Sequence, residues 1–251
     1  LVLVLVLFSH PDCDLDGIEC DVCPPSPDGP LSSNGKPMPA LKCPEMFHIV
    51  KLNMGFVGLS GALVDISPLQ YLNEISLPGN QITGHLPSLS SFTALTSLTL
   101  YHNKFDGTLP DNLGDAISLV ELDLDHNLLT GIIPESIAKL TNLKVLDLAH
   151  NQFSGIIPEG LGELTNLRKL DLSFNSFEGD LPESISKLTK LKKLNLDANE
   201  NLNIVLSDET CDRTKVCMPM QEESASTPFI NTAASRVLLM AWCCVVMLVL
   251  G

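Results

Sequence analysis

The sequence predicts an α/β repeat solenoid of about seven coils of 24 residues, in which each coil adds one strand to a parallel sheet. A periodic asparagine is the first observation, since Asn residues recur every 23 or 24 positions, at Asn80, Asn103, Asn127, Asn151, Asn175 and Asn199. The second is that each of the first five is followed by a Gly four residues later and a Pro seven residues later. So regular a period indicates stacked units that each contact only their neighbours.

The first half of each repeat is predicted to be a short strand. In residues 145–149 apolar and polar residues alternate, so Leu146 and Leu148 should face the core and Asp147 the opposite side. One such strand cannot bury its apolar side alone. Neighbouring strands about 4.8 Å apart therefore have to form a continuous sheet.

The second half of each repeat begins at the asparagine. Its side chain offers an acceptor and donors, so the six asparagines are predicted to bind backbone groups of their own and the next coil. The Gly permits a tight bend, and the Pro holds an extended backbone before a short helical return. The register continues upstream, where Ile49, Leu52 and Met54 occupy strand positions and Val57 stands in place of the asparagine.

Each unit reads L-x-x-L-x-L-x-x-N-x-[IFL]-x-G-x-[IL]-P. This motif resembles the plant-type leucine-rich repeat of extracellular receptor and defence proteins, over residues 47–206. The resemblance implies a curved right-handed superhelix with the sheet on its concave side. The resemblance does not identify the ligand. A protein or peptide is the predicted ligand, and a co-receptor is a further candidate partner.

The sequence divides into six predicted segments. They are residues 1–9 (remnant of a signal peptide), 10–46 (cysteine-containing cap with a Pro-rich insertion), 47–206 (repeats), 207–220 (C-terminal cap), 221–236 (polar spacer) and 237–251 (apolar tail).

All eight cysteines lie outside the repeats. Residues 11–20 resemble the N-terminal cap of the family, with Leu15 where the family usually has Trp. The resemblance suggests the pairs Cys13–Cys20, Cys23–Cys43 and Cys211–Cys217, although sequence alone leaves the connectivity open. A zinc site is the alternative, and it is disfavoured because no set with ligand spacing recurs. Paired cysteines favour an oxidising, extracellular compartment.

Both ends of the sequence are apolar. Residues 1–8 fit the core of a signal peptide and are too short to span a bilayer, and a spurious start is the alternative. Residues 237–251 follow a polar spacer and the small residues 224–226, which together predict a glycosylphosphatidylinositol (GPI) signal with attachment at Ser224. That reading predicts a protein held on the outer face of the plasma membrane. A short membrane-spanning tail and a truncated receptor remain alternatives.

Residues at equal repeat positions line up as surface columns. Asp123, Asp147 and Asp171 form one column, which either keeps the sheet face soluble or has a dedicated role, since stacked like charges cost stability. A second column is expected to place three histidines about 5 Å apart. Drift at a tolerant position, a ligand-contact patch, and a metal site or pH switch stay open as its interpretations. The candidate ligand-binding residues are Tyr101, His102, Asp125, His126, His150, Lys169, Phe174 and Lys193.

Composition and motifs narrow the function classes. The net charge of −15 argues against nucleic-acid binding. No nucleophile elbow, phosphate loop or HExxH motif is present, so neither an enzyme, nor a cofactor, nor a metal is predicted. The predicted function is non-enzymatic recognition of a protein or peptide at the cell surface. A secreted inhibitor of wall-degrading enzymes, similar to polygalacturonase-inhibiting proteins, and a structural surface-coat protein are the alternatives.

Overall fold

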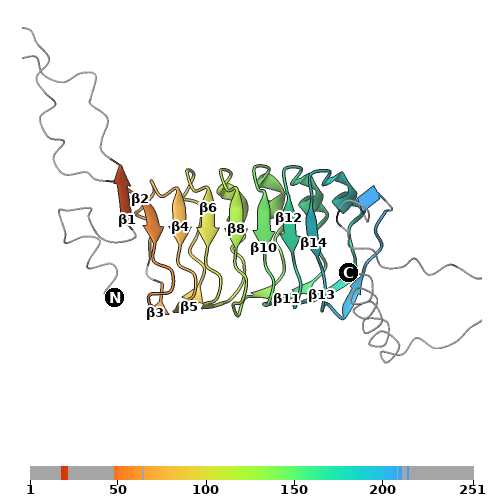
Figure 1. The fold of residues 1–251 in the computed structure, drawn as a ribbon, viewed down its shortest axis with the longest axis horizontal. Helices are drawn as coiled ribbons and strands as arrows, with labels where there is room; N and C mark the ends of the chain where they lie inside the picture. The colour runs from red at the N-terminus through yellow and green to blue at the C-terminus, as the bar shows by residue number, and fades with distance from the viewer. Residues whose placement is uncertain (1–17, 22–47, 64, 208, 211–213, 215–251) are drawn as a thin grey trace, which may run out of the picture. The chain divides into compact units, whose positions relative to one another are not determined.

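The protein folds as a solenoid of about seven coils, as the repeat period predicts. The structure is a computed structural model that describes residues 18–21, 48–63, 65–207, 209–210 and 214. Its main sheet has eight strands among these residues, in the order β1-β2-β4-β6-β8-β10-β12-β14. Successive coils place these strands next to one another along the solenoid (Figure 1).

The main sheet is parallel except at its first strand, because β1 pairs antiparallel with β2. The register carries the leucine of one strand onto that of the next, as Leu122, Leu146 and Leu170 show. The strands are β1 (Ile18–Asp21), β2 (His48–Asn53), β4 (Glu74–Ser76), β6 (Ser97–Thr99), β8 (Glu121–Asp123), β10 (Val145–Asp147), β12 (Lys169–Asp171) and β14 (Lys193–Asn195).

A second row of short strands follows the asparagines, where the repeat pattern predicts only a bend. These strands form two further parallel sheets. They are β3 (Ser60–Ala62), β5 (Gln81–His85), β7 (Lys104–Asp106), β9 (Thr130–Gly131), β11 (Gln152–Gly155), β13 (Ser176–Asp180) and β15 (Asn201–Asn203). The repeated glycine lies at or next to their ends with a positive φ, for example +79° at Gly131. A side chain there would be strained and would also meet Thr108 of the preceding coil at 2.8 Å.

The returns are short 3-10 helices, which agrees with the predicted helical return. They are η1 (Leu113–Asp115), η2 (Glu135–Lys139), η3 (Glu159–Glu163) and η4 (Glu183–Lys187). The repeated proline precedes each of the last three, and it is extended at Pro134 (φ −71°, ψ 145°) and at Pro158 (φ −70°, ψ 143°). Each helix buries an apolar residue, such as Ile137 or Leu161, against the leucines of the sheet.

The asparagines hold one coil to another inside the solenoid. Asn151 donates from Nδ2 to the carbonyls of Leu148 and Ala149 in its own coil and to that of Leu124 in the preceding coil. Its Oδ1 accepts the Leu129 N–H, also in the preceding coil. The other five repeat this pattern, so the bonds run to the preceding coil, whereas the sequence pattern suggests the next one.

Several predictions concern residues that the structure does not describe. The three predicted cysteine pairs lie outside the described residues, and only the backbone of Cys20 is described, in β1. Ser224 and the segments 1–9, 221–236 and 237–251 also lie outside them. In the described part of the chain, no helix is long and apolar enough to cross a bilayer.

Candidate recognition site

Four neighbouring rings form a row across four consecutive coils, shortly after the C-terminal ends of the main strands. We call this set, His102, His126, His150 and Phe174, the aromatic ladder. Its successive ring centroids are 4.1, 4.0 and 4.1 Å apart. The interplanar angle falls along the ladder from 40° to 29° to 11°, so the last three rings are stacked. The spacing is closer than the 5 Å expected from the strands alone, because the rings lean onto one another.

The backbone explains where these rings point. All four ladder residues occupy the position before the repeated asparagine and have φ between +50° and +54°. This left-handed conformation is uncommon for residues other than glycine, and histidine is enriched several-fold in it. The repeat therefore forces an unusual backbone at this position, and the side chains leave the sheet along one edge.

Two further aromatic residues extend the ladder toward the N-terminus. Tyr101 lies 5.8 Å from His102, and Phe56 lies 6.3 Å from Tyr101, both edge to face. Gly79 occupies the ladder position of the intervening coil, and the Phe56 ring covers it so closely that a Cβ there would lie 2.1 Å from the ring. Phe56 is not among the predicted ligand-binding residues. It could have been predicted, because it precedes Val57, which stands at the asparagine position of the first coil.

The ladder is open to solvent at both ends. His102 at one end is exposed and Phe174 at the other end is 51% exposed, and His126 is exposed between them. Phe56, which lies beyond the ladder on the N-terminal side, is 69% exposed. Aromatic rings combine a large apolar area with few rotatable bonds, so they are enriched at binding hot spots. Exposed rings that are already aligned form a surface that a partner can cover at small entropic cost.

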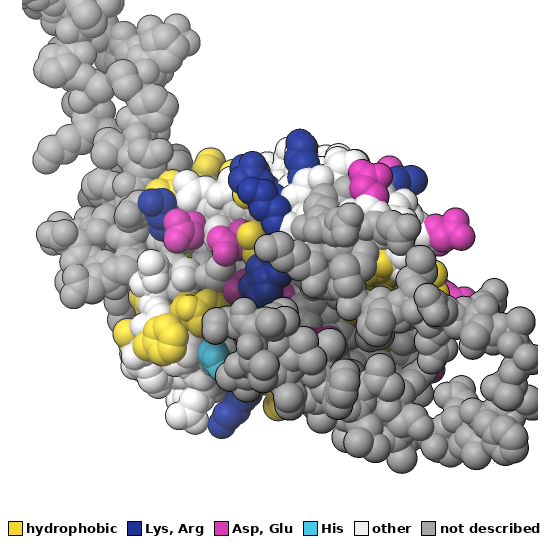
Figure 2. Space-filling view, turned by 45° about the vertical axis from the view of Figure 1, so that its right-hand side comes forward, with side chains coloured by type: hydrophobic (Ala, Val, Ile, Leu, Met, Phe, Trp, Pro, Cys, Tyr) yellow, Lys and Arg dark blue, Asp and Glu magenta, His cyan; other side chains and the backbone are white. Residues whose placement is uncertain are grey.

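The neighbouring Asp column is more buried than the sequence predicts. Asp147 and Asp171 face away from the core, yet each is only 6% exposed, so they cannot keep the sheet face soluble. Lysines from the next coil cover them, since Lys169 Nζ lies 2.5 Å from Asp147 Oδ2 and Lys193 Nζ lies 3.6 Å from Asp171 Oδ2. Figure 2 shows such basic and acidic side chains interspersed on the surface.

This Asp–Lys pairing stops at Asp123. The register places residue 145 where Lys169 and Lys193 stand in the later coils, and that residue is Val145. Burial raises the pKa of Asp123 to about 6, against the hydrogen bond from the Asp125 N–H, and the charge of Asp147 adds to the increase. An acidic group without a matching lysine therefore lies on the strand next to the ladder.

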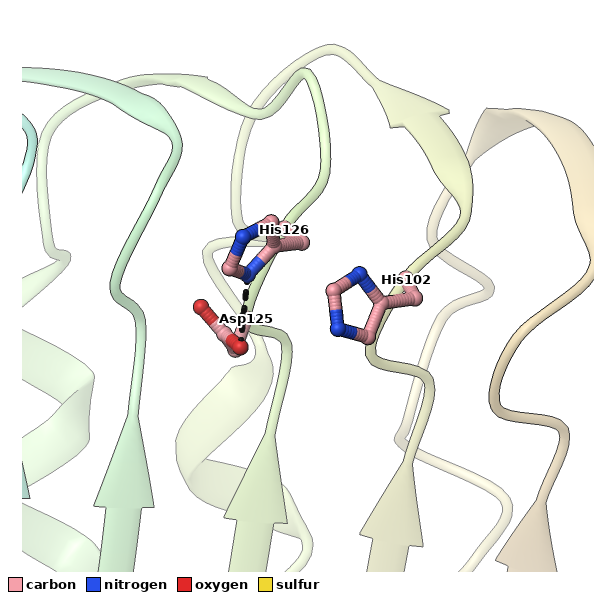
Figure 3. Close-up of side chains that lie close together, drawn as sticks. All are labelled: His102, Asp125 and His126. Atoms are coloured by element: carbon pink, nitrogen blue, oxygen red, sulfur yellow. Dashed lines mark hydrogen bonds and ion pairs between the residues drawn. The ribbon is translucent and has the colours of Figure 1, made fainter.

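Asp125 brings a carboxylate to the ladder itself. Its Oδ2 lies 2.8 Å from His126 Nδ1, and His102 leans toward this pair from the preceding coil (Figure 3). Its Oδ1 is buried and has no hydrogen-bond partner. One candidate ligand atom from each of the three side chains lies within 4.8 Å of the other two.

The structure divides the predicted ligand-binding residues into two groups. Tyr101, His102, Asp125, His126, His150 and Phe174 come together along the ladder. Lys169 and Lys193 instead begin strands β12 and β14, where their ammonium groups pair with the Asp column. Lys193 keeps 60% of its side chain exposed, whereas Lys169 keeps 31%.

Comparison with known proteins agrees with the repeat pattern. Residues 117–177 and 94–116 match two family models, each described as leucine rich repeat. A probably inactive leucine-rich repeat receptor-like protein kinase of Arabidopsis thaliana is 35% identical over 81 residues, which are 32% of this chain and 8% of that protein.

Solved structures show the same fold. A pollen receptor kinase 3 is similar with a TM-score of 0.61 and 29% identity, over 77% of this chain and 83% of that chain. The Arabidopsis thaliana receptor kinase HAESA, in complex with the peptide hormone IDA and the co-receptor SERK1, is 31% identical with a TM-score of 0.54. That match covers 59% of this chain and 24% of the HAESA chain, so this chain spans only a small part of HAESA and of the receptor-like kinase above.

Proposed function

Because the chain carries a plant-type extracellular leucine-rich-repeat domain, we propose that it is a non-enzymatic recognition module for a protein or peptide ligand. The ligand lies along the aromatic ladder and contacts rings from several coils at once. The observation that carries this proposal is the continuous, partly exposed row of neighbouring rings from His102 to Phe174. An extended ligand suits a stack that itself crosses successive coils.

The charge next to the ladder indicates which ligand groups would be favoured. Asp123 and Asp125 belong to the coil of β8, and Val145 of the next coil stands where later coils have the pairing lysine. A lysine or arginine of the ligand would supply the positive charge that this coil lacks, whereas an acidic group would be repelled. We therefore expect a ligand with a basic residue near the aromatic contact.

The similar receptors suggest how such a module works. HAESA was solved with both a peptide hormone and a co-receptor. By that likeness, a co-receptor is a proposed second partner of this chain. Lys193, with its exposed side chain, is a proposed contact at the C-terminal end of the sheet.

Attachment to the outer face of the plasma membrane completes the proposal. It rests on the small residues 224–226, the spacer and the apolar residues 237–251. Treatment of intact cells with a phosphatidylinositol-specific phospholipase should release the protein if Ser224 carries the anchor. Retention of the protein while an anchored control is released would contradict this part.

Binding measurements test the recognition site. Peptides that bind the full chain would be selected from a displayed library and their affinities measured by calorimetry. The double variant His126→Asn/His150→Asn removes two rings but keeps a residue type that tolerates the left-handed backbone. It should bind at least about tenfold more weakly, because rings at hot spots contribute more than 1 kcal/mol each.

His85→Asn is the matched control, since His85 is an exposed histidine on β5 away from the ladder. Its affinity should equal that of the unaltered chain. Equal binding by the double variant and the unaltered chain would contradict the proposed site.

A further inference from the structure

We propose that His102, Asp125 and His126 bind one divalent transition-metal ion, for which zinc is the best chemical match. Two imidazoles and one carboxylate are a ligand set that suits zinc and its neighbours in the first transition row. The three candidate ligand atoms lie within 4.8 Å of one another. They come from two adjacent coils, so a bound ion would link the coils as well as the side chains (Figure 3).

Small side-chain movements convert this cluster into a metal site. Tetrahedral coordination with bonds of about 2.0–2.2 Å separates the ligand atoms by about 3.4 Å. The His126 Nδ1–Asp125 Oδ2 contact of 2.8 Å would therefore open slightly to admit the ion. His102 would move inward, which its exposed side chain permits. The fourth position would face solvent and hold water.

The carboxylate of Asp125 distinguishes the coil of His126 from the other coils of the ladder. The residue before each ladder histidine is Tyr101, Asp125 or Ala149 in successive coils, so only the middle coil pairs an acid with its imidazole. Among the described repeats, Asp197 has the same repeat position, but Ala198 follows it. Two imidazoles and a carboxylate therefore meet at a single site.

Local charge and unused bonding capacity favour a cation here. Glu121 and Asp123 of β8 come shortly before Asp125 in the same coil, and Val145 stands where later coils have the lysine that pairs with the Asp column. The Asp125 Oδ1 atom is buried without a hydrogen-bond partner, so the carboxylate is not fully satisfied by His126. An ion would supply positive charge to this group.

Zinc titration of the full chain tests the site. The protein would be dialysed against a chelator, and zinc binding would then be measured by calorimetry for the unaltered chain, His102→Asn and Asp125→Asn. Each variant removes one ligand and should weaken zinc binding at this site at least about tenfold. His150→Asn is the matched control, because it makes the same change at the same repeat position one coil further and leaves all three ligands.

The control also separates this inference from the proposed function. His150→Asn should retain zinc affinity while it weakens ligand binding at the ladder. The metal site is wrong if His102→Asn and Asp125→Asn bind zinc as the unaltered chain does, or if His150→Asn loses as much affinity as they do. Comparing variants cancels any zinc held elsewhere on the chain, including at cysteines.

Discussion

At the scale of single residues, one repeat position combines an unusual backbone with an exposed side chain. His102, His126, His150 and Phe174 all have positive φ, so the residue type there is limited by the backbone as well as by any ligand. Histidine satisfies both demands, since it tolerates the left-handed region and provides a ring. The backbone does not require histidine, because Phe56 and Ala198 adopt the same conformation at this position in other coils.

Two substitutions of His126 separate backbone strain from loss of the ring. Both His126→Asn and His126→Val remove the imidazole, but valine is β-branched and is strained at φ +53°. The valine variant should be less stable than the asparagine variant by about 1–2 kcal/mol. Denaturant unfolding in metal-free buffer measures the difference, and equal stability of the two variants would argue against the left-handed conformation.

The repeated asparagines make a different residue-scale prediction. Asn151→Ala leaves three carbonyls and the Leu129 N–H without their side-chain partner inside the solenoid. The variant should lose about 2–4 kcal/mol of stability, because unpaired buried polar groups are costly. Asn142→Ala, which removes one exposed hydrogen bond to the Ile117 carbonyl, is the control and should cost under about 1 kcal/mol. Similar losses in both variants would contradict a structural role for the asparagine column.

At the scale of elements, the strands of the main sheet carry an incomplete row of charge pairs. Lys169 and Lys193 neutralise the Asp residue of the preceding strand, and Val145 leaves Asp123 without that partner. The folded-state pKa of Asp123 is about 6, above its ordinary value of 3.8. The folded state therefore binds this proton more tightly, so stability falls as pH rises from about 4 to about 6.

Asp123→Asn should remove this cost. At pH 7 in metal-free buffer the variant should be more stable by up to about 1 kcal/mol, a value discounted for partial solvent exposure. The gain should vanish below about pH 4, where the aspartate is protonated in both states. Asp147→Asn is the contrasting variant, and it should destabilise the protein because it breaks the ion pair with Lys169. A lower melting temperature for Asp123→Asn at pH 7 would contradict this explanation.

Periodicity predicts the elements better than it predicts their contacts. The leucine, asparagine, glycine and proline positions are sufficient to predict the main strands, the bends and the helical returns. The second row of strands is not predicted, because strands such as Lys104–Asp106 are too short to show a hydrophobic pattern of their own. The burial of Asp147 is also not predicted, since it depends on which residue of the next coil covers its carboxylate.

At the scale of the whole solenoid, stacking turns distant residues into one surface. The aligned columns are sufficient to place the three histidines and Phe174 together. They do not predict the cluster of His102, Asp125 and His126, because the metal site that the sequence leaves open is assigned to the histidine column alone, without Asp125. That cluster depends on side-chain rotamers and on the positive φ of the ladder position, which spacing alone does not reveal.

The same stacking makes the ladder a continuous recognition surface, and this is the central claim. Its most direct test is the nuclear magnetic resonance signal of each histidine Cε1–H group, recorded as a selected peptide ligand is added to the full chain. The signals of His102, His126 and His150 should shift or broaden together, while that of His85 on β5 stays in place. Unchanged ladder signals at a saturating ligand concentration would contradict the claim.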